Sequence, residues 1–309
     1  MAKVPAGDMP EYAILNGNLL PFGEARVSIM APGLTFAAAV FEGIRAYWND
    51  EDEALYLFRM QEHLDRLQFS MRVVEFDDPP ASDTIAAQIQ EVIKANGMRE
   101  DCYIRAQVFI DEWGDIAATG PTGSSVIVRR RPRQPGVAAG KHFVVSSWRR
   151  IEDDASPARI KATGNYLNSR LVSLEASRQG AGGAIILNRD GTVSEGPSGC
   201  VFMVRDATLI TPPVTAGILE SVTRATLLTL AADLGIDTVE RPIGRTELYL
   251  ASEVFYCGTG QEIVPILSVD KKAVGSGEPG AMTRQLQGVY DAVVHGREQK
   301  YMKWLTPAL

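Results

Sequence analysis

The stretch Ile160–Leu167, with the sequence IKATGNYL, connects a lysine to the start of a predicted helix. Lys161 is followed by a short Ala-Thr-Gly step whose small residues leave the backbone flexible. After this step the apolar residues recur at helical spacing, which predicts a helix over Tyr166–Arg178 that ends before Gly180. The face of this helix that we expect to be buried carries Leu167, Leu171 and Leu174.

Lys161 is the lysine of this chain that is best placed for chemistry. An amine becomes reactive near neutral pH when it is positioned and partly desolvated. The other lysines lie near the termini, in a turn after Asp270, on the polar face of a helix or, like Lys141, at the border of a linker. A lysine by itself is weak support for a site, because most lysines are exposed charges.

The bulk composition is that of a globular protein that binds small molecules. The chain has 309 residues, of which 45% are apolar and 22% are charged, and this length favours two domains with a cleft between them. The formal net charge of −7 and the pI near 5.2 argue against broad binding to nucleic acid or to an anionic membrane surface, since both would repel an acidic protein.

Several other site classes are not expected from the sequence. No segment approaches the roughly 20 consecutive apolar residues that span a bilayer, so we expect a cytoplasmic protein without membrane contact. The three cysteines are far apart and resemble reduced, buried thiols. The three histidines form no ligand-like pair, so no metal site is predicted.

A linker divides the chain into two predicted domains. The segment from Arg129 to Lys141 has the sequence RRRPRQPGVAAGK, in which prolines and glycines oppose any regular element. We therefore predict a smaller N-terminal domain over residues 1–130, a linker over 131–137 and a larger C-terminal domain over 138–309. The arginines of this segment favour a solvated linker over an anion-binding patch, but an arginine that faces a substrate carboxylate stays open.

Periodicity and turn signals predict the main elements of both domains. In the first, Asn16-Gly17 predicts a turn between extended segments at Tyr12–Leu15 and Ala25–Met30. The remaining predicted elements of the chain are helices at Met60–Met71, Ser82–Asn96 and Thr223–Leu234, and strands at Leu55–Phe58, Tyr103–Ile110, Ser125–Arg129, Phe143–Trp148, Ala184–Asn188, Val201–Arg205 and Glu253–Cys257.

The lysine stretch and four further segments, in the same order along the chain, resemble the class IV, or fold-type IV, aminotransferases that depend on pyridoxal 5′-phosphate (PLP). Together they extend over about residues 12 to 270, and five ordered motifs are hard to obtain by chance. The four segments are VFEGIRAY at Val40–Tyr47, LFRMQEHLDRL at Leu57–Leu67, DGTVSEG at Asp190–Gly196, and the pair formed by Thr211–Thr226 and Glu253–Ile266.

The resemblance implies a cofactor site around PLP. Lys161 matches the lysine that holds PLP as a Schiff base and moves the proton, Glu195 the glutamate facing the pyridine nitrogen, and Tyr166 the tyrosine at the ring hydroxyl. The residues implied for the phosphate are Arg59, Val222 and Thr223 at a helix start, and Thr259. For Arg59 alone, a surface ion pair with Glu62 or Asp65 is the simpler interpretation, and His63 is typical of a structural histidine.

Within this family the sequence is most similar to the branched-chain amino acid aminotransferases. The implied activity is amino transfer between leucine, isoleucine or valine and 2-oxoglutarate by ping-pong half-reactions, with a smaller N-terminal α/β domain, a barrel-like C-terminal domain and a homodimer or larger assembly. An aromatic wall suits aliphatic side chains, and an arginine can bind the distal carboxylate of glutamate. The implied substrate residues are Phe36, Phe41, Gly43, Tyr103, Arg105, Gly260 and Gln261.

Three departures from the branched-chain pattern leave the substrate open. Phe36 stands where a tyrosine is usual, and the segments EGPSGCVF and GTGQEI differ from the common EGSGENxF and GTAAEI. A D-amino-acid or (R)-amine transaminase is therefore the nearest alternative. An aminodeoxychorismate lyase is disfavoured by Arg105 and by the FEG segment, and a scaffold without catalysis is disfavoured by the intact Lys161, Tyr166 and Glu195.

Overall fold

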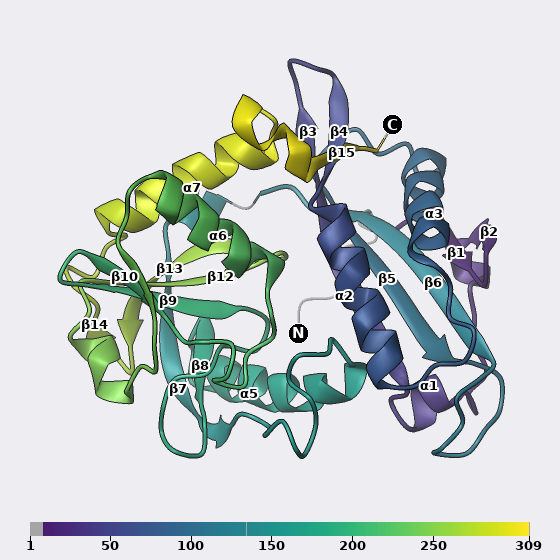
Figure 1. Ribbon diagram of the computed structural model, residues 1–309, viewed down its shortest axis with the longest axis horizontal. Helices are drawn as coiled ribbons and strands as arrows, with labels where there is room; N and C mark the ends of the chain where they lie inside the picture. The colour runs from purple at the N-terminus through teal and green to yellow at the C-terminus, as the bar shows by residue number, and fades with distance from the viewer. Residues whose placement is uncertain (1–8, 134, 309) are drawn as a thin grey trace. The chain divides into compact units, whose positions relative to one another are not determined.

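The computed structural model describes residues 9–133 and 135–308, which form two compact units (Figure 1). The first unit consists of Met1–Pro132, Ile160–Gly164 and Val293–Leu309, and the second of Arg133–Arg159 and Asn165–Ala292. The units are therefore discontinuous in sequence, unlike the two predicted domains. The C-terminal segment, which the sequence assigned to the second domain, belongs to the first unit because its strand pairs with a strand of the first sheet.

The first unit is built on an antiparallel sheet. Its order in the described residues is β15-β4-β3-β5-β6-β1-β2. The long strands β3, β5 and β6 lie side by side in its middle, and each pairs over most of its length. The bounds are β1 Tyr12–Leu15, β2 Asn18–Pro21, β3 Ala39–Asn49, β4 Ala54–Phe58, β5 Cys102–Ile110, β6 Thr122–Arg130 and β15 Leu305–Pro307.

One face of this sheet forms the core of the first unit. Helices α2 (Met60–Val73) and α3 (Ser82–Ala95) pack their apolar residues against alternate residues of the central strands. Figure 1 shows both helices on the same side of β5 and β6. Because side chains alternate along a strand, the intervening residues point to the opposite face. The shorter elements of the unit are α1 at Pro32–Thr35 and the 3₁₀ turns at Phe22–Glu24 and Gln299–Trp304.

The second unit is built on a mixed sheet with the order β11-β10-β9-β12-β13-β7-β8, and β14 pairs with β13. Strands β7 and β8 are parallel neighbours, and helix α5 connects them, as parallel pairing requires. The bounds are β7 Lys141–Arg149, β8 Gly183–Leu187, β9 Cys200–Arg205, β10 Thr208–Thr211, β11 Thr238–Glu240, β12 Glu253–Gly258, β13 Glu262–Val269 and β14 Lys272–Ala273.

Helices and apolar side chains of the second unit cover its sheet. One cluster joins buried residues of β7, β9, β12 and β13, and a smaller one joins α5 to β7 and β8. The helices are α4 at Pro135–Ala138, α5 at Tyr166–Arg178, α6 at Val222–Asp233 and α7 at Ala281–Val294, with a 3₁₀ turn at Arg245–Tyr249. A further 3₁₀ turn at Thr163–Asn165 begins in the first unit and ends at the first residue of the second segment of this unit. The helix that we predicted over Tyr166–Arg178 is confirmed with both bounds.

Three local predictions were wrong. The segment Ala25–Met30 is not a strand, because the chain turns back at once at Asn16-Gly17 and pairs β2 with β1. The short helix α4 lies in the segment that was predicted to lack regular structure. Helix α5 buries the residues Ser169, Val172 and Ala176 rather than its leucines, and Leu167 is 63% exposed.

The described residues also bear on the predictions about membrane helices, metal sites and cysteines. Within the residues 9–133 and 135–308, no helix is long and apolar enough to cross a membrane. In this part of the chain, no cluster of His, Cys, Asp and Glu could hold a metal ion. Cys102, Cys200 and Cys257 are buried free thiols.

A buried ion cluster fixes helix α2 to strand β3. The carboxylate of Glu42 accepts hydrogen bonds from Nε of Arg66 at 2.6 Å and from the second guanidinium nitrogen at 2.8 Å, and Nδ1 of His63 lies 2.7 Å from its Oε2. Burial raises the pKa of Glu42, but Arg66 and His63 outweigh this effect and hold that pKa well below its usual range. Burial also lowers the pKa of His63, so its predicted structural role agrees with a neutral, hydrogen-bonded ring.

Replacing Glu42 with Gln should destabilise the protein by about 3–5 kcal/mol at pH 7, because it removes the buried carboxylate charge that compensates the Arg66 charge. Asp65→Asn on the same helix, where the side chain is exposed and bonded to Gln61, is the matched control and should stay within about 0.5 kcal/mol. Since the folded pKa of Glu42 is lowered, its contribution is present above the unfolded pKa of about 4.3 and is lost as the pH falls through the lower folded value. Urea unfolding at pH 7 measures both variants, and equal stability would contradict the role of the cluster.

Candidate functional site

Lys161 lies beside the first sheet, at an edge that the sheet itself leaves open. Strand β4 pairs with β3 only from Ala46 onward, so the earlier part of β3 lacks a neighbour from β4 on that side. The segment around Lys161 takes this place: Val40 and Ala162 form an antiparallel bridge, and the Phe41 N–H donates to the Lys161 carbonyl at 3.0 Å. The backbone of the lysine is thus fixed by the sheet.

Two further bonds hold the same segment. The Lys161 N–H donates to Oγ of Ser70, a fully buried residue of α2, at 3.2 Å. The Thr163 hydroxyl donates to the carbonyls of Ala37 and Ala39. Helix α2 and the start of β3 therefore hold the lysine segment from both sides.

The alternation of side chains fixes the direction of the lysine. Ala162 packs against the core face of the sheet, so Lys161 must point to the opposite face. There its Nζ lies 5.0 Å from the centroid of the Phe41 ring. The amine is thus held over an aromatic residue that the sequence predicted in the substrate site.

The same face carries the other predicted substrate residues of the first unit. Gly43 and Arg105 are direct neighbours in the β3–β5 register. The Arg105 guanidinium carbon lies 3.9 Å from the Phe41 ring centroid, and its Nε donates to Oε1 of Gln107 at 3.2 Å. A side chain at Gly43 would overlap the Tyr103 hydroxyl, so the glycine is required for the tyrosine to lie across β3.

Arg59 has an unusual backbone conformation and two side-chain contacts. It lies at the junction of β4 and α2 with a φ of 50°, which a non-glycine residue seldom adopts. Its Nε donates to Oε1 of Glu62 at 2.7 Å, and its guanidinium carbon lies 4.9 Å from the Trp304 ring centroid. The ion pair with Glu62 was the simpler sequence interpretation, and it is formed in this structure.

Phe36 stands apart from the residues around Lys161. It follows α1, where its N–H donates to the Pro32 carbonyl, and its side chain is 48% exposed. No described contact joins it to Phe41 or Arg105. Its role in a substrate pocket stays a prediction.

In the second unit, Glu195 is a buried carboxylate with a fixed arginine partner. Residues 193–195 run beside β8, and the Glu195 carbonyl accepts from the Ile186 N–H at 2.8 Å. The carboxylate Oε1 lies 2.7 Å from a guanidinium nitrogen of Arg150, with both side chains 6% exposed. Arg150 is fixed in turn because its Nε donates to the Gly217 carbonyl at 2.8 Å.

The start of α6 is suited to an anion. Val222 and Thr223 are buried in its first turn, and Ser221 caps the helix by accepting from the Arg224 N–H at 3.2 Å. First-turn N–H groups and the positive end of the helix dipole stabilise negative charge there. Thr259, Gly260 and Gln261 are half-buried in the turn between β12 and β13.

Tyr166 is the first residue of α5 and is half-buried. The preceding Asn165 is 5% exposed and fixes the helix start, because its Nδ2 donates to the Pro157 carbonyl at 2.9 Å and its Oδ1 accepts from the Ser156 hydroxyl. The predicted residues therefore fall into two groups. The first unit holds Phe36, Phe41, Gly43, Arg59, Tyr103, Arg105 and Lys161, and the second holds Tyr166, Glu195, Val222, Thr223, Thr259, Gly260 and Gln261.

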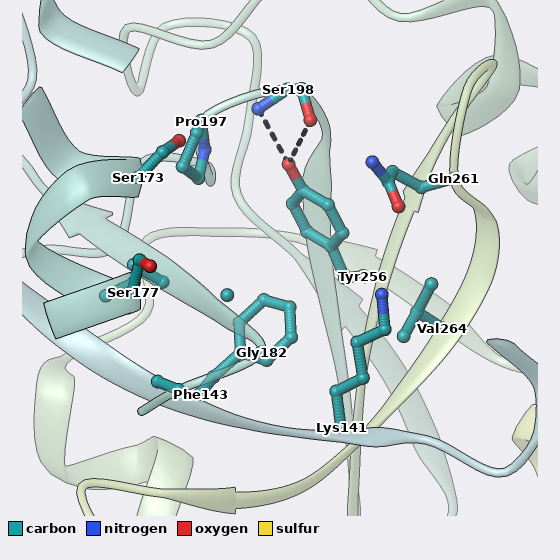
Figure 2. Close-up of a pocket in the computed structure, with 14 residues that line it drawn as sticks. Lys141, Phe143, Ser173, Ser177, Gly182, Pro197, Ser198, Tyr256, Gln261 and Val264 are labelled. Carbon is teal, nitrogen blue, oxygen red and sulfur yellow. Dashed lines mark hydrogen bonds between the residues drawn. The ribbon is translucent and has the colours of Figure 1, made fainter. Parts of the chain in front are cut away.

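A cavity of about 280 Å³ in the second unit contains a different lysine, Lys141 (Figure 2). Figure 2 shows the Tyr256 hydroxyl against Ser198, where it accepts from the Ser198 N–H at 2.7 Å. No carboxylate and no arginine are among the described residues that line this cavity. It lacks the charged partners that a phosphorylated pyridine would need, so it does not compete with Lys161.

Sequence reasoning missed two residues that position the site. Arg150 follows β7, and its pairing with Glu195 joins residues 45 positions apart, which no local pattern indicates. Ser70 lies inside α2, three residues beyond the LFRMQEHLDRL segment, and no sequence pattern singled it out. For Arg150, the weak signal was a pair of arginines after the predicted strand Phe143–Trp148, in the sequence SSWRR.

Comparisons with known proteins agree with these motifs. The family model of amino-transferase class IV matches residues 39–269. A probable branched-chain-amino-acid aminotransferase of Aquifex aeolicus is 37% identical, with 96% of each chain covered. The branched-chain amino acid aminotransferase of Thermobaculum terrenum in its PLP form is 40% identical, with a TM-score of 0.92 over 98% of this chain and 99% of that chain.

A further solved structure is the branched-chain aminotransferase of the thermophilic archaeon Thermoproteus uzoniensis with norvaline. It is 38% identical, with a TM-score of 0.92 over 97% of this chain and 100% of that chain. These matches confirm the predicted two-domain α+β fold of the fold-type IV enzymes. The chain belongs to the class IV aminotransferase family.

Proposed function

We propose that this chain transfers an amino group between a branched-chain L-amino acid and 2-oxoglutarate, with PLP held by Lys161. The observation that carries the proposal is the place of Lys161: sheet and helix fix its backbone, and its amine lies over Phe41 on the face that also carries Arg105. Relatives named as branched-chain aminotransferases support the substrate class.

The residues of the chain fit PLP. Lys161 offers a positioned amine, and the N-terminal turn of α6 suits the phosphate, with Thr259 and Arg59 as the further predicted phosphate partners. Glu195 offers a buried carboxylate for the ring nitrogen, and Tyr166 a phenol for the ring hydroxyl. When bound, PLP supplies an aldehyde for the lysine amine and a ring that withdraws electrons from the reacting carbon.

Two side chains of this protein manage the protons of the reaction. Lys161 would take the proton from the α-carbon of a bound substrate and return it two bonds away, beyond the amino nitrogen, because β3 and α2 fix its backbone. Glu195 holds a proton at the ring nitrogen, and Arg150 stabilises the charged carboxylate and fixes its orientation. The same two groups serve both halves of a ping-pong cycle.

The open face of the first sheet explains how one site can take two kinds of side chain. The Phe41 ring offers an apolar surface to the aliphatic group of leucine, isoleucine or valine. The Arg105 guanidinium, stacked on the same ring, offers a charged partner for the distal carboxylate of glutamate or 2-oxoglutarate. We therefore propose that both substrates bind over Phe41.

A second copy of the chain is the partner that we propose. Two apolar segments of the first unit are exposed: Ile29, Trp113 and Ile116 are each more than three quarters accessible. They lie close together, since a side chain at Gly114 would approach Pro32 to 3.2 Å. An exposed apolar surface of this kind marks a protein interface, which supports a homodimer.

The proposed activity is tested with a screen of amino donors. The purified protein with added PLP should use L-leucine, L-isoleucine or L-valine with 2-oxoglutarate as the acceptor, and Lys161→Ala should abolish transfer while Lys141→Ala retains it. Product 2-oxo acids are measured for both enantiomers of each donor and with pyruvate as a second acceptor. Activity with D-alanine or (R)-1-phenylethylamine alone would assign the chain to the alternative group of the family.

Replacing Glu195 with Gln should leave PLP binding intact but lower turnover by about 10²-fold or more, because an amide does not stabilise a protonated ring nitrogen. The control is Glu253→Gln, whose carboxylate caps α7 through the N–H groups of Met282 and Thr283. This control should lose stability but keep its turnover per folded molecule. Near-normal turnover of Glu195→Gln would reject the role given to Glu195.

The proposed dimer predicts that Trp113→Asp with Ile116→Asp yields a monomer, because two charges would be buried in the interface. The double variant Leu234→Asp with Leu250→Asp, at exposed positions of the second unit, is the matched control and should remain a dimer. Sedimentation velocity measures the mass of each variant. A wild-type protein that sediments as a monomer would contradict the proposal.

A further inference from the structure

The open face of the first sheet carries a second arginine next to the predicted substrate residues. Tyr103 and Arg129 are direct neighbours in the β5–β6 register, and the Arg129 guanidinium carbon lies 5.4 Å from the Tyr103 ring centroid. Arg131 approaches the same ring at 5.7 Å. A guanidinium carries five N–H donors in a planar fork, the geometry that binds a carboxylate.

These arginines lie one step farther from the reacting amine than Arg105 does. Along β3, Phe41 comes first, Gly43 is paired with Arg105, and Arg45 is paired with Tyr103. Successive residues on one face of a strand are about 7 Å apart, but the Tyr103 hydroxyl reaches back to Gly43, so the ring that Arg129 approaches lies closer to the Arg105 position than the backbone spacing indicates. From the amine over Phe41 outward, the face therefore presents the Arg105 position and then the Tyr103–Arg129 pair.

The charge of this face is positive, although the chain as a whole is acidic. Lys161, Arg105, Arg129 and Arg131 all contribute cations to it. The neighbouring Asp101 is already engaged, because its carboxylate lies 3.5 Å from a nitrogen of Arg45 and accepts from the Trp48 N–H. Within residues 9–133 and 135–308, no carboxylate is paired with Arg129. An anionic ligand would supply the missing charge.

The next residue along the strand behaves differently. Arg130 points to the other side of β6, where its Nε lies 3.2 Å from Oε1 of Glu100. Its side chain is 57% exposed, and surface ion pairs of this kind contribute little. Arg130 is therefore a matched control for Arg129 with the same chemistry and the opposite direction.

We propose that Arg129, which lies over the Tyr103 ring, is a second carboxylate subsite that extends the substrate range to dicarboxylic acids longer than glutamate. The inference rests on the proposed aminotransferase function. Arg105 binds the distal carboxylate of a five-carbon substrate, and Arg129 binds that of a six-carbon substrate, 2-aminoadipate or 2-oxoadipate. An uncharged side chain, as in 4-methyl-2-oxopentanoate, uses neither arginine.

The test compares three acceptors in four proteins: wild type, Arg105→Ala, Arg129→Ala and Arg130→Ala. In Arg129→Ala, kcat/KM for 2-oxoadipate should fall roughly ten-fold or more, as for the loss of one charged hydrogen-bond partner, while kcat/KM for 4-methyl-2-oxopentanoate stays within about two-fold. Arg105→Ala should affect 2-oxoglutarate more than 2-oxoadipate. Arg130→Ala should resemble wild type with every acceptor.

Equal losses with all three acceptors in Arg129→Ala, or no loss with 2-oxoadipate, would overturn the subsite. Arg129→Lys keeps the charge and should recover part of the 2-oxoadipate activity, which a defect in folding would not explain. Adipate and glutarate binding, measured by calorimetry on the same holoproteins, does not require turnover. Weaker adipate binding in Arg129→Ala would support the subsite even if the protein transfers no amino group. Failure of the subsite and failure of the proposed function are therefore distinguishable.

Discussion

The pairing of the Lys161 segment with the open edge of β3 is the constraint on which the rest of the candidate site depends. Because β4 covers only the later part of β3, the earlier part accepts Ala162 as a neighbour and directs Lys161 to the face opposite the core. A single edge thus decides which side chains the amine can reach. Moving this segment by one residue would turn the lysine into the core and the alanine onto the open face.

Each unit contains a buried glutamate whose charge is stabilised by an arginine. Glu42 in the first unit is held by Arg66 and His63, and Glu195 in the second is held by Arg150. A buried charge without a partner is strongly destabilising, so each arginine is required wherever its glutamate is. Glu42 uses this pairing to fix α2, the helix that also holds the Lys161 backbone through Ser70, whereas Glu195 uses it to present one carboxylate in a set direction.

The sequence was sufficient for features that are local and insufficient for those that depend on distant pairing. The bounds of α5 follow from the spacing of its apolar residues, but the side of the helix that is buried does not. Ser169, Val172 and Ala176 are buried instead of the leucines, because smaller side chains allow the helix to approach the sheet more closely. The motif around Lys161 predicted the lysine, whereas the open edge of β3 and the Arg150–Glu195 pair join segments far apart in the chain. The segment 293–309 likewise joins the first unit only through the pairing of β15 with β4.

Lys161, fixed by β3 and α2, is the lysine that we propose to hold the cofactor. The most direct measurement is borohydride reduction of the protein with PLP bound, followed by digestion and mass spectrometry of the modified peptide. We expect a single phosphopyridoxyl group on Lys161, in the peptide that contains KATGNY. Modification of Lys141, or of any other lysine in preference to Lys161, would contradict this expectation.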